Sequence, residues 1–107
     1  MWRVSWSKEY TIDTIVLYNR ADCCQERLIG ATVRVNDQIV GTVARSEDMM
    51  RFQFSGLNVT TSQVEVWGGT EGPALEALSL AEVEVFLVED ETSTLLPLLY
   101  LAVIYII

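Results

Sequence analysis

The chain has 107 residues, a length that suits one domain with a modest core. Half of its residues are hydrophobic, and its formal net charge at pH 7 is −8. This acidic balance disfavours nucleic acid and anionic membrane surfaces as partners, because both attract basic proteins. The sequence contains two cysteines and no histidine, which disfavours zinc binding and histidine-based catalysis. We therefore expect no enzyme, and uncharged glycans and cations remain as candidate ligands.

Short alternating segments separated by turn residues fill the chain as far as about residue 88. Residues 1–18 are strand-like, and the break in alternation near Asp13 indicates a bulge or bend. Residues 31–44 are typical of a hairpin, with Gly41 marking a bulge. Further strands are predicted at 52–54, 63–67 and 78–88. Short strands at this close spacing predict an all-β sandwich or barrel.

The segment between the first two predicted strands carries the most distinctive chemistry. Residues 19–27 read Asn-Arg-Ala-Asp-Cys-Cys-Gln-Glu-Arg. Two nearby guanidinium groups repel each other, and Asp22 can accept hydrogen bonds from Arg20 and fix its direction. The remaining donors of Arg20 and Arg27 then point outward, toward acceptors such as the ring and hydroxyl oxygens of a sugar. The competing interpretation is that both arginines are ordinary solvated surface residues.

Cys23 and Cys24 are adjacent in the chain. A bridge between neighbouring residues forms a tight ring with a distorted peptide, outside the usual geometry of a disulfide. It closes almost no loop and gives little entropic stabilisation, so its use would be local, as a rigid apolar knob. The alternative is a pair of free thiols.

The run from Leu17 to Leu28 resembles the signature of the eel-type fucolectins, which carry the fucose-binding F-type lectin domain. In that signature an aspartate follows an arginine by two residues, and a second basic residue lies five beyond the aspartate. The residues that match the signature are Arg20, Asp22 and Arg27, with the family's contiguous cysteines at Cys23 and Cys24. The flanking segments 2–4, 30–31 and 78–86 agree in order, so the resemblance covers roughly residues 1–88.

The resemblance implies an antiparallel β-sandwich of the jelly-roll, discoidin-like type over residues 1–88. It also implies a non-catalytic lectin module that recognises terminal L-fucose on glycans, as a homo-oligomer or in tandem copies. Arg20 and Arg27 would donate hydrogen bonds to the sugar, Asp22 would orient them, and a Cys23–Cys24 bridge would pack against its apolar edge. The alternative is a discoidin-like adhesion or interaction domain that has lost sugar binding.

A structural calcium ion is a further implication of the resemblance. In the family its ligands include a backbone carbonyl and an acidic side chain of the final strand, which fall on Ala81 and Glu82. Ala81 stands where the family has a cysteine. The family's other calcium ligands and a sugar-site histidine lie upstream of the matched segment. We therefore expect the chain to lack the N-terminal part of its domain and not to bind calcium tightly alone.

Asn58-Val59-Thr60 is a glycosylation sequon, which matters only in a secreted protein. The chain does not begin with a recognisable signal peptide. The resemblance nevertheless implies an extracellular or secreted location.

The end of the chain has a different composition from the rest. Residues 89–94 form an acidic polar linker, and residues 95–107 are almost wholly apolar. This apolar tail is shorter than the roughly 20 residues of a membrane-spanning helix. It is interpreted as a truncated transmembrane segment, a terminus without function or an extra strand, and the first two are favoured. A membrane anchor would place the protein at the cell surface.

Overall fold

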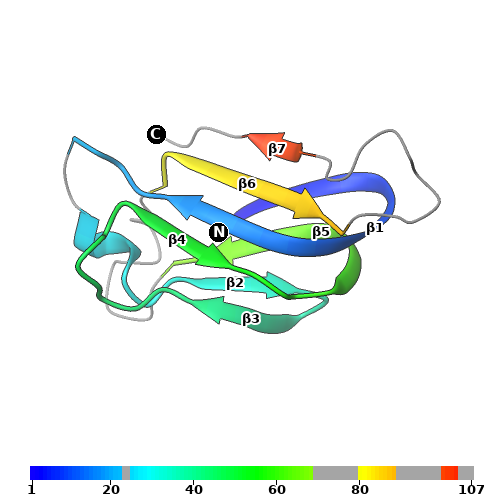
Figure 1. Ribbon diagram of the computed structural model, residues 1–107, viewed down its shortest axis with the longest axis horizontal. Coiled ribbons are helices and arrows are strands. Elements are labelled where there is room, and N and C mark those ends of the chain that lie inside the picture. The colour runs from blue at the N-terminus through cyan, green and yellow to red at the C-terminus, as the bar shows by residue number, and fades with distance from the viewer. Residues whose placement is uncertain (23–24, 69–79, 89–99, 104–107) are drawn as a thin grey trace.

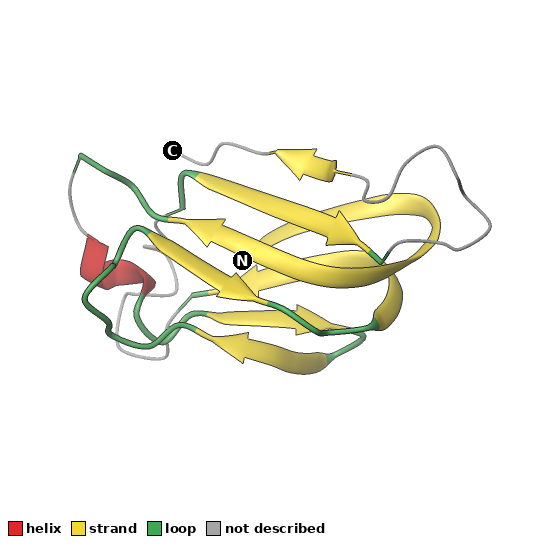
Figure 2. Ribbon diagram, viewed as in Figure 1, coloured by secondary structure: helices red, strands yellow, loops and turns green. Residues whose placement is uncertain are grey.

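The computed structural model describes residues 1–22, 25–68, 80–88 and 100–103. Their regular elements are β1 (Trp2–Tyr18), the 3-10 helix η1 (Gln25–Leu28), β2 (Thr32–Val35), β3 (Gln38–Thr42), β4 (Arg51–Phe54), β5 (Val59–Trp67), β6 (Glu82–Leu87) and β7 (Tyr100–Val103). Every strand pairing among them is antiparallel (Figures 1 and 2). The predicted all-β fold is therefore confirmed.

Strand β1 belongs to both layers of the molecule. Its first part pairs with β5, from Trp2 opposite Val66 onward, and this layer continues through β2 to β3. Its last part lies between β4 and β6, and β7 adds to the outer side of β6. Figure 1 shows β1 curving from one layer into the other. The result is an antiparallel β-sandwich, as predicted.

Two irregularities let β1 change layers. Its register with β5 shifts between Ser5 and Tyr10, and its register with β6 shifts between Ile12 and Thr14. Extra residues of this kind bend a strand and increase its twist. The second shift lies at the bulge or bend predicted near Asp13. Neither shift interrupts the strand, so β1 runs continuously from Trp2 to Tyr18.

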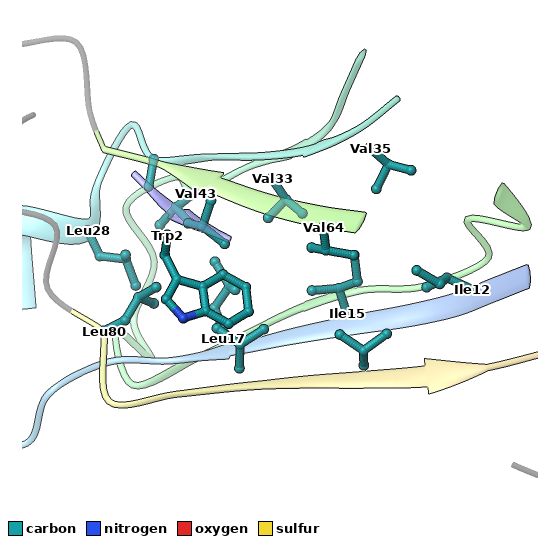
Figure 3. Packing of buried hydrophobic residues seen from close by; sticks show 14 of the residues in the cluster. Trp2, Ile12, Ile15, Leu17, Leu28, Val33, Val35, Val43, Val64 and Leu80 are labelled. Carbon is teal, nitrogen blue, oxygen red and sulfur yellow. The ribbon is translucent and has the colours of Figure 1, made fainter. Parts of the chain in front are cut away.

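The core lies between the two layers. Alternating residues of β2 and β5 are buried, and they meet Ile15 and Leu17 of β1 from the opposite layer (Figure 3). Alternating residues of β6, which pairs with this part of β1, are buried as well. The fully buried side chains with the largest volumes are Ile12, Ile15, Leu17, Leu28 and Leu80. Burial of these apolar surfaces is the main favourable contribution to folding.

The predicted hairpin is formed by β2 and β3. Its turn is Asn36-Asp37, and both residues have positive φ angles, 53° and 63°. A two-residue turn with this backbone matches the twist of the flanking strands, and asparagine and aspartate tolerate it better than most residues. The turn therefore fixes the register of β3 on β2.

Gly41 lies at a bulge of this hairpin, as predicted. Val33 is opposite Gly41 whereas Arg34 is opposite Ile39, so Val40 is the extra residue. The ring of Phe54 packs on Gly41 so closely that a Cβ atom there would clash with the Cδ1 atom of Phe54. Glycine thus allows β4 and β3 to approach along one side of the sandwich.

The predicted strand at 78–88 corresponds to β6, which is shorter. Leu80 and Ala81 lie before its first residue, and Val88 lies after its last. Beyond it, residues 100–103 form β7, with Tyr100 opposite Phe86 and Val103 opposite Glu84. This part of the tail agrees with the interpretation as an extra strand. The predicted linker and the rest of the tail lie outside the described residues. Among those residues, no helix is long and apolar enough to cross a membrane.

A buried carboxylate lies on the outer face of the β2–β5 layer. Glu65 is only 6% exposed, and its Oε2 atom accepts hydrogen bonds from Nε and Nη2 of Arg3 at 2.9 and 2.6 Å. Its Oε1 atom accepts a longer one, of 3.4 Å, from the indole of Trp67, over which the Arg34 guanidinium stacks at 4.6 Å. The pKa of Glu65 is lowered, mainly by the hydrogen bonds from Arg3. The hydrogen bond from Trp67 and the positive charges of Arg3 and Arg34 lower it further.

This lowered pKa predicts an acid-dependent loss of stability. Ionised Glu65 stabilises the folded chain above the ordinary glutamate pKa of 4.5, and that contribution disappears as the pH falls through the lower folded-state value. We expect the free energy of unfolding to fall more steeply below about pH 5 in the wild type than in Glu65→Gln. Urea titrations across this pH range measure the difference. Glu47→Gln, at an exposed loop position, is the control. If the free energy of unfolding fell equally steeply below about pH 5 in all three proteins, the prediction would be contradicted.

Candidate functional site

The predicted motif lies at one end of the sandwich. We call residues 19–31 the motif loop and residues 43–50 the β3–β4 loop. The two loops run side by side: the Gly30 amide donates to the Val43 carbonyl, and the Val43 amide donates to the Ala31 carbonyl, both at 2.8 Å. Figure 1 shows η1 and the β3–β4 connection at the same end of the molecule. The sequence therefore presents the motif on a loop that a second loop supports.

Asn19 joins the two loops. It is 3% exposed, and its Nδ2 atom donates to the carbonyls of Gln25 and Met49, at 2.9 and 2.8 Å. Its Oδ1 atom accepts from the amide of Arg20 at 2.8 Å, and its own amide donates to the Met50 carbonyl. This role was missed from the sequence. The available signal was a polar residue placed directly after the buried end of a strand.

Arg20 and Asp22 form the ion pair that the sequence predicts. Nε of Arg20 donates to Oδ1 of Asp22 at 3.0 Å, and Nη2 donates to Oδ2 at 2.6 Å. The pairing raises the pKa of Arg20 and holds the guanidinium plane in one direction. The Gln25 side chain also donates to the Arg20 carbonyl at 3.1 Å, which fixes the backbone at this position.

Arg27 and Leu28 close the motif on η1, a short helix that the sequence pattern did not predict. Leu28 is fully buried, whereas Arg27 is exposed. Within the described residues the Arg27 side chain makes no hydrogen bond or ion pair. Leu28 thus anchors η1 in the core while Arg27 faces solvent. Cys23 and Cys24 lie outside the described residues, so their predicted bridge is untested.

The residues predicted for calcium lie close to this end of the sandwich. The Ala81 amide donates to the carbonyl of Tyr18, the last residue of β1, at 2.8 Å, and Glu82 is opposite Tyr18 in the pairing. In the described part of the chain, no group of three or more His, Cys, Asp or Glu could hold a metal ion. Calcium takes six to eight oxygens, and Ala81 and Glu82 offer fewer. They do not complete a calcium site by themselves.

Asn58, the predicted glycosylation residue, lies directly before β5 and not in the motif loop. It is exposed and has a positive φ of 48°. The hydroxyl of Thr60, the third residue of the sequon, lies 2.8 Å from that of Thr11. Its exposure leaves Asn58 accessible, and its modification stays a prediction.

The fold and the motif loop together define a β-sandwich with arginines gathered at one end. Among curated proteins, the chain is similar to the Fucolectin of Anguilla anguilla, with 28% identity over 90 residues that cover 78% of this chain and 57% of the eel protein. It is also 27% identical to Fucolectin-3 and Fucolectin-4 of Anguilla japonica, over 78% of this chain and 50% of each relative. The chain thus spans about half the length of the curated relatives it matches.

No family model matches the chain, and no solved structure matches it. The similarity to the fucolectins is distant, yet it extends over most of the chain. It supports placement in a family related to the F-type lectins.

Proposed function

We propose that this chain is a non-catalytic carbohydrate-binding module that recognises terminal L-fucose on extracellular glycans. The observation that carries the proposal is the pairing of Arg20 with Asp22 on the same loop as the exposed Arg27, at one end of a β-sandwich. The similarity to proteins named fucolectins supports the choice of sugar.

The chemistry of the arginines suits a sugar. A guanidinium has five N–H donors, and Asp22 engages two of those of Arg20. The others remain for a ligand, in a plane that Asp22 fixes. Arg27 keeps all of its donors within the described residues. Planar donor forks match pairs of neighbouring oxygens, which a sugar presents along its ring.

The adjacent cysteines complete the proposed site. In this proposal Cys23 and Cys24 form a bridge that packs against the apolar edge of the sugar, between the two arginines in the sequence. Intact-mass measurement with and without reductant tests the bridge, which lowers the mass by two hydrogens. Loss of fucose binding on reduction would support its role at the site.

The test of the function is an L-fucose titration of the full chain, purified without reductant. Tryptophan fluorescence or calorimetry follows binding, with calcium and again with a chelator. We expect saturable binding of L-fucose and none of D-galactose. A folded protein that binds neither sugar would refute the proposal and favour an adhesion or interaction domain without sugar binding.

Replacing Arg27 with alanine isolates the role of its side chain. The loss of a charged hydrogen-bond donor costs about 1.5–3 kcal/mol, so fucose affinity should fall roughly 10- to 100-fold. Thermal stability should hardly change, because Arg27 is exposed and unpaired within the described residues. Lys8→Ala removes an exposed cation of β1, between Ser5 and Tyr10 where its register with β5 shifts, and serves as the control. Unchanged affinity in Arg27→Ala would remove this residue from the site.

A further inference from the structure

Strand β3 lies at the border of its sheet. Within the described residues it pairs with β2 alone, and Figure 1 shows it at the edge of the layer. An edge strand presents unpaired N–H and C=O groups, which proteins usually protect with charged residues, proline or bulges. The segment Gln38–Thr42 reads Gln-Ile-Val-Gly-Thr and contains neither charge nor proline. The bulge at Val40 is its one protective feature within this segment.

The outward side chains of β3 include an apolar one. Ile39 is 56% exposed, more than any other large hydrophobic residue of the described chain. It lies opposite Arg34 on the outer face of the layer. Gln38 and Thr42 are exposed as well. The edge is therefore uncharged, accessible and partly apolar, which favours the addition of another strand.

Charged residues flank this neutral segment with opposite signs. Asp37 precedes β3 and Arg45 follows it, and each lies four residues from Gly41. Both are exposed, and neither forms an ion pair within the described residues. In an antiparallel alignment of two copies of β3 centred near Gly41, Asp37 of each copy lies beside Arg45 of the other. A two-fold axis creates this contact at both ends at once.

We propose that β3 is a self-association edge, where two copies of this chain pair through their β3 strands in antiparallel fashion. The exposed edge supplies the backbone hydrogen bonds, and Ile39 lies on the apolar part of the junction. The complementary end charges select a second copy in this orientation as the occupant. The net charge of −8 on each chain opposes association at long range, so the dimer is weaker at low salt than at moderate salt.

This geometry has a consequence that rests on the proposed function. The end of β3 leads into Val43, which is hydrogen-bonded to the motif loop. Antiparallel pairing therefore places the motif loops of the two copies at opposite ends of the dimer. Such a dimer would bridge glycans on two separate surfaces rather than engage two neighbouring glycans on one surface.

Charge reversal tests the interface without any sugar. Sedimentation velocity of the full chain over a concentration series should show a monomer–dimer equilibrium. Asp37→Arg and Arg45→Asp each place like charges at both ends, so each variant alone should dimerise about 10-fold more weakly. Mixed together, the two variants should form a heterodimer as tight as the wild-type dimer, because each end again pairs an arginine with an aspartate.

Matched variants separate the interface from general charge and folding effects. Lys8→Asp, a reversal outside β3, should leave the equilibrium unchanged, and Ile39→Lys should prevent dimerisation. Circular dichroism verifies that each variant is folded, notably Asp37→Arg, whose backbone has positive φ. A wild-type chain that stays monomeric throughout the series would overturn the proposal. A dimer that neither reversal weakens, or that mixing does not restore, would also overturn it.

Discussion

Replacing Asn19 with aspartate should lower the free energy of unfolding by about 3 kcal/mol or more, because it removes two buried donors at once. The side chain keeps its shape, but an oxygen then faces the carbonyls of Gln25 and Met49 at hydrogen-bond distance. Urea titration at neutral pH measures the loss. In protein that remains folded, L-fucose affinity should fall too, because Arg20 and η1 are no longer fixed relative to each other.

The matched control is Asn36→Asp in the hairpin turn. Asn36 donates one exposed hydrogen bond, 3.0 Å long, to the carbonyl of Thr60, and aspartate tolerates its positive φ. Its loss should cost about 1 kcal/mol or less and leave sugar binding unchanged. Equal effects of the two substitutions would show that Asn19 does not hold the loops in the way described.

Leu28→Ala should destabilise the chain by about 2–5 kcal/mol, the cost of a cavity at a fully buried leucine. Leu28 is 0% exposed, and it is the residue by which η1 enters the core. Thermal and urea unfolding measure this cost. At temperatures where the variant is still folded, weaker fucose binding is expected, because η1 also carries Arg27.

Leu57→Ala provides the comparison for Leu28. Leu57 is partly buried against the same core but lies in the connection between β4 and β5. Leu57→Ala should lower the free energy of unfolding by less than Leu28→Ala does, and it should not affect fucose binding. If Leu28→Ala lost stability but bound fucose as tightly as the wild type, the anchor would be structural only.

Local patterns account for what the sequence predicted correctly. Alternation placed the valines of β2, β5 and β6 on the buried face, and the break near Asp13 marked the bulge of β1. The Arg20–Asp22 pair was predictable because the two residues are separated by one position only. Each of these features depends on neighbours within a few residues of the chain.

The features that were missed depend on distant partners. Asn19 is important because the carbonyl of Met49 lies beside it, thirty positions along the chain. Glu65 occupies an outward position by alternation, yet Arg3 and neighbouring strands bury it. Strand β5 begins at Val59, before its predicted start, because its first residues pair with β1 beyond the bulge. No local pattern contains these contacts.

Because β1 pairs in both layers of the sandwich, it also constrains the order in which the chain can fold. Trp2 pairs with Val66 and Tyr18 pairs with Glu82, so each end of β1 pairs with a residue 64 positions further along the chain. Contacts of such sequence separation slow folding, typically to milliseconds or seconds. During synthesis on a ribosome, β1 therefore emerges before β5 and β6, and it can be paired on both sides only after both of these strands have been made.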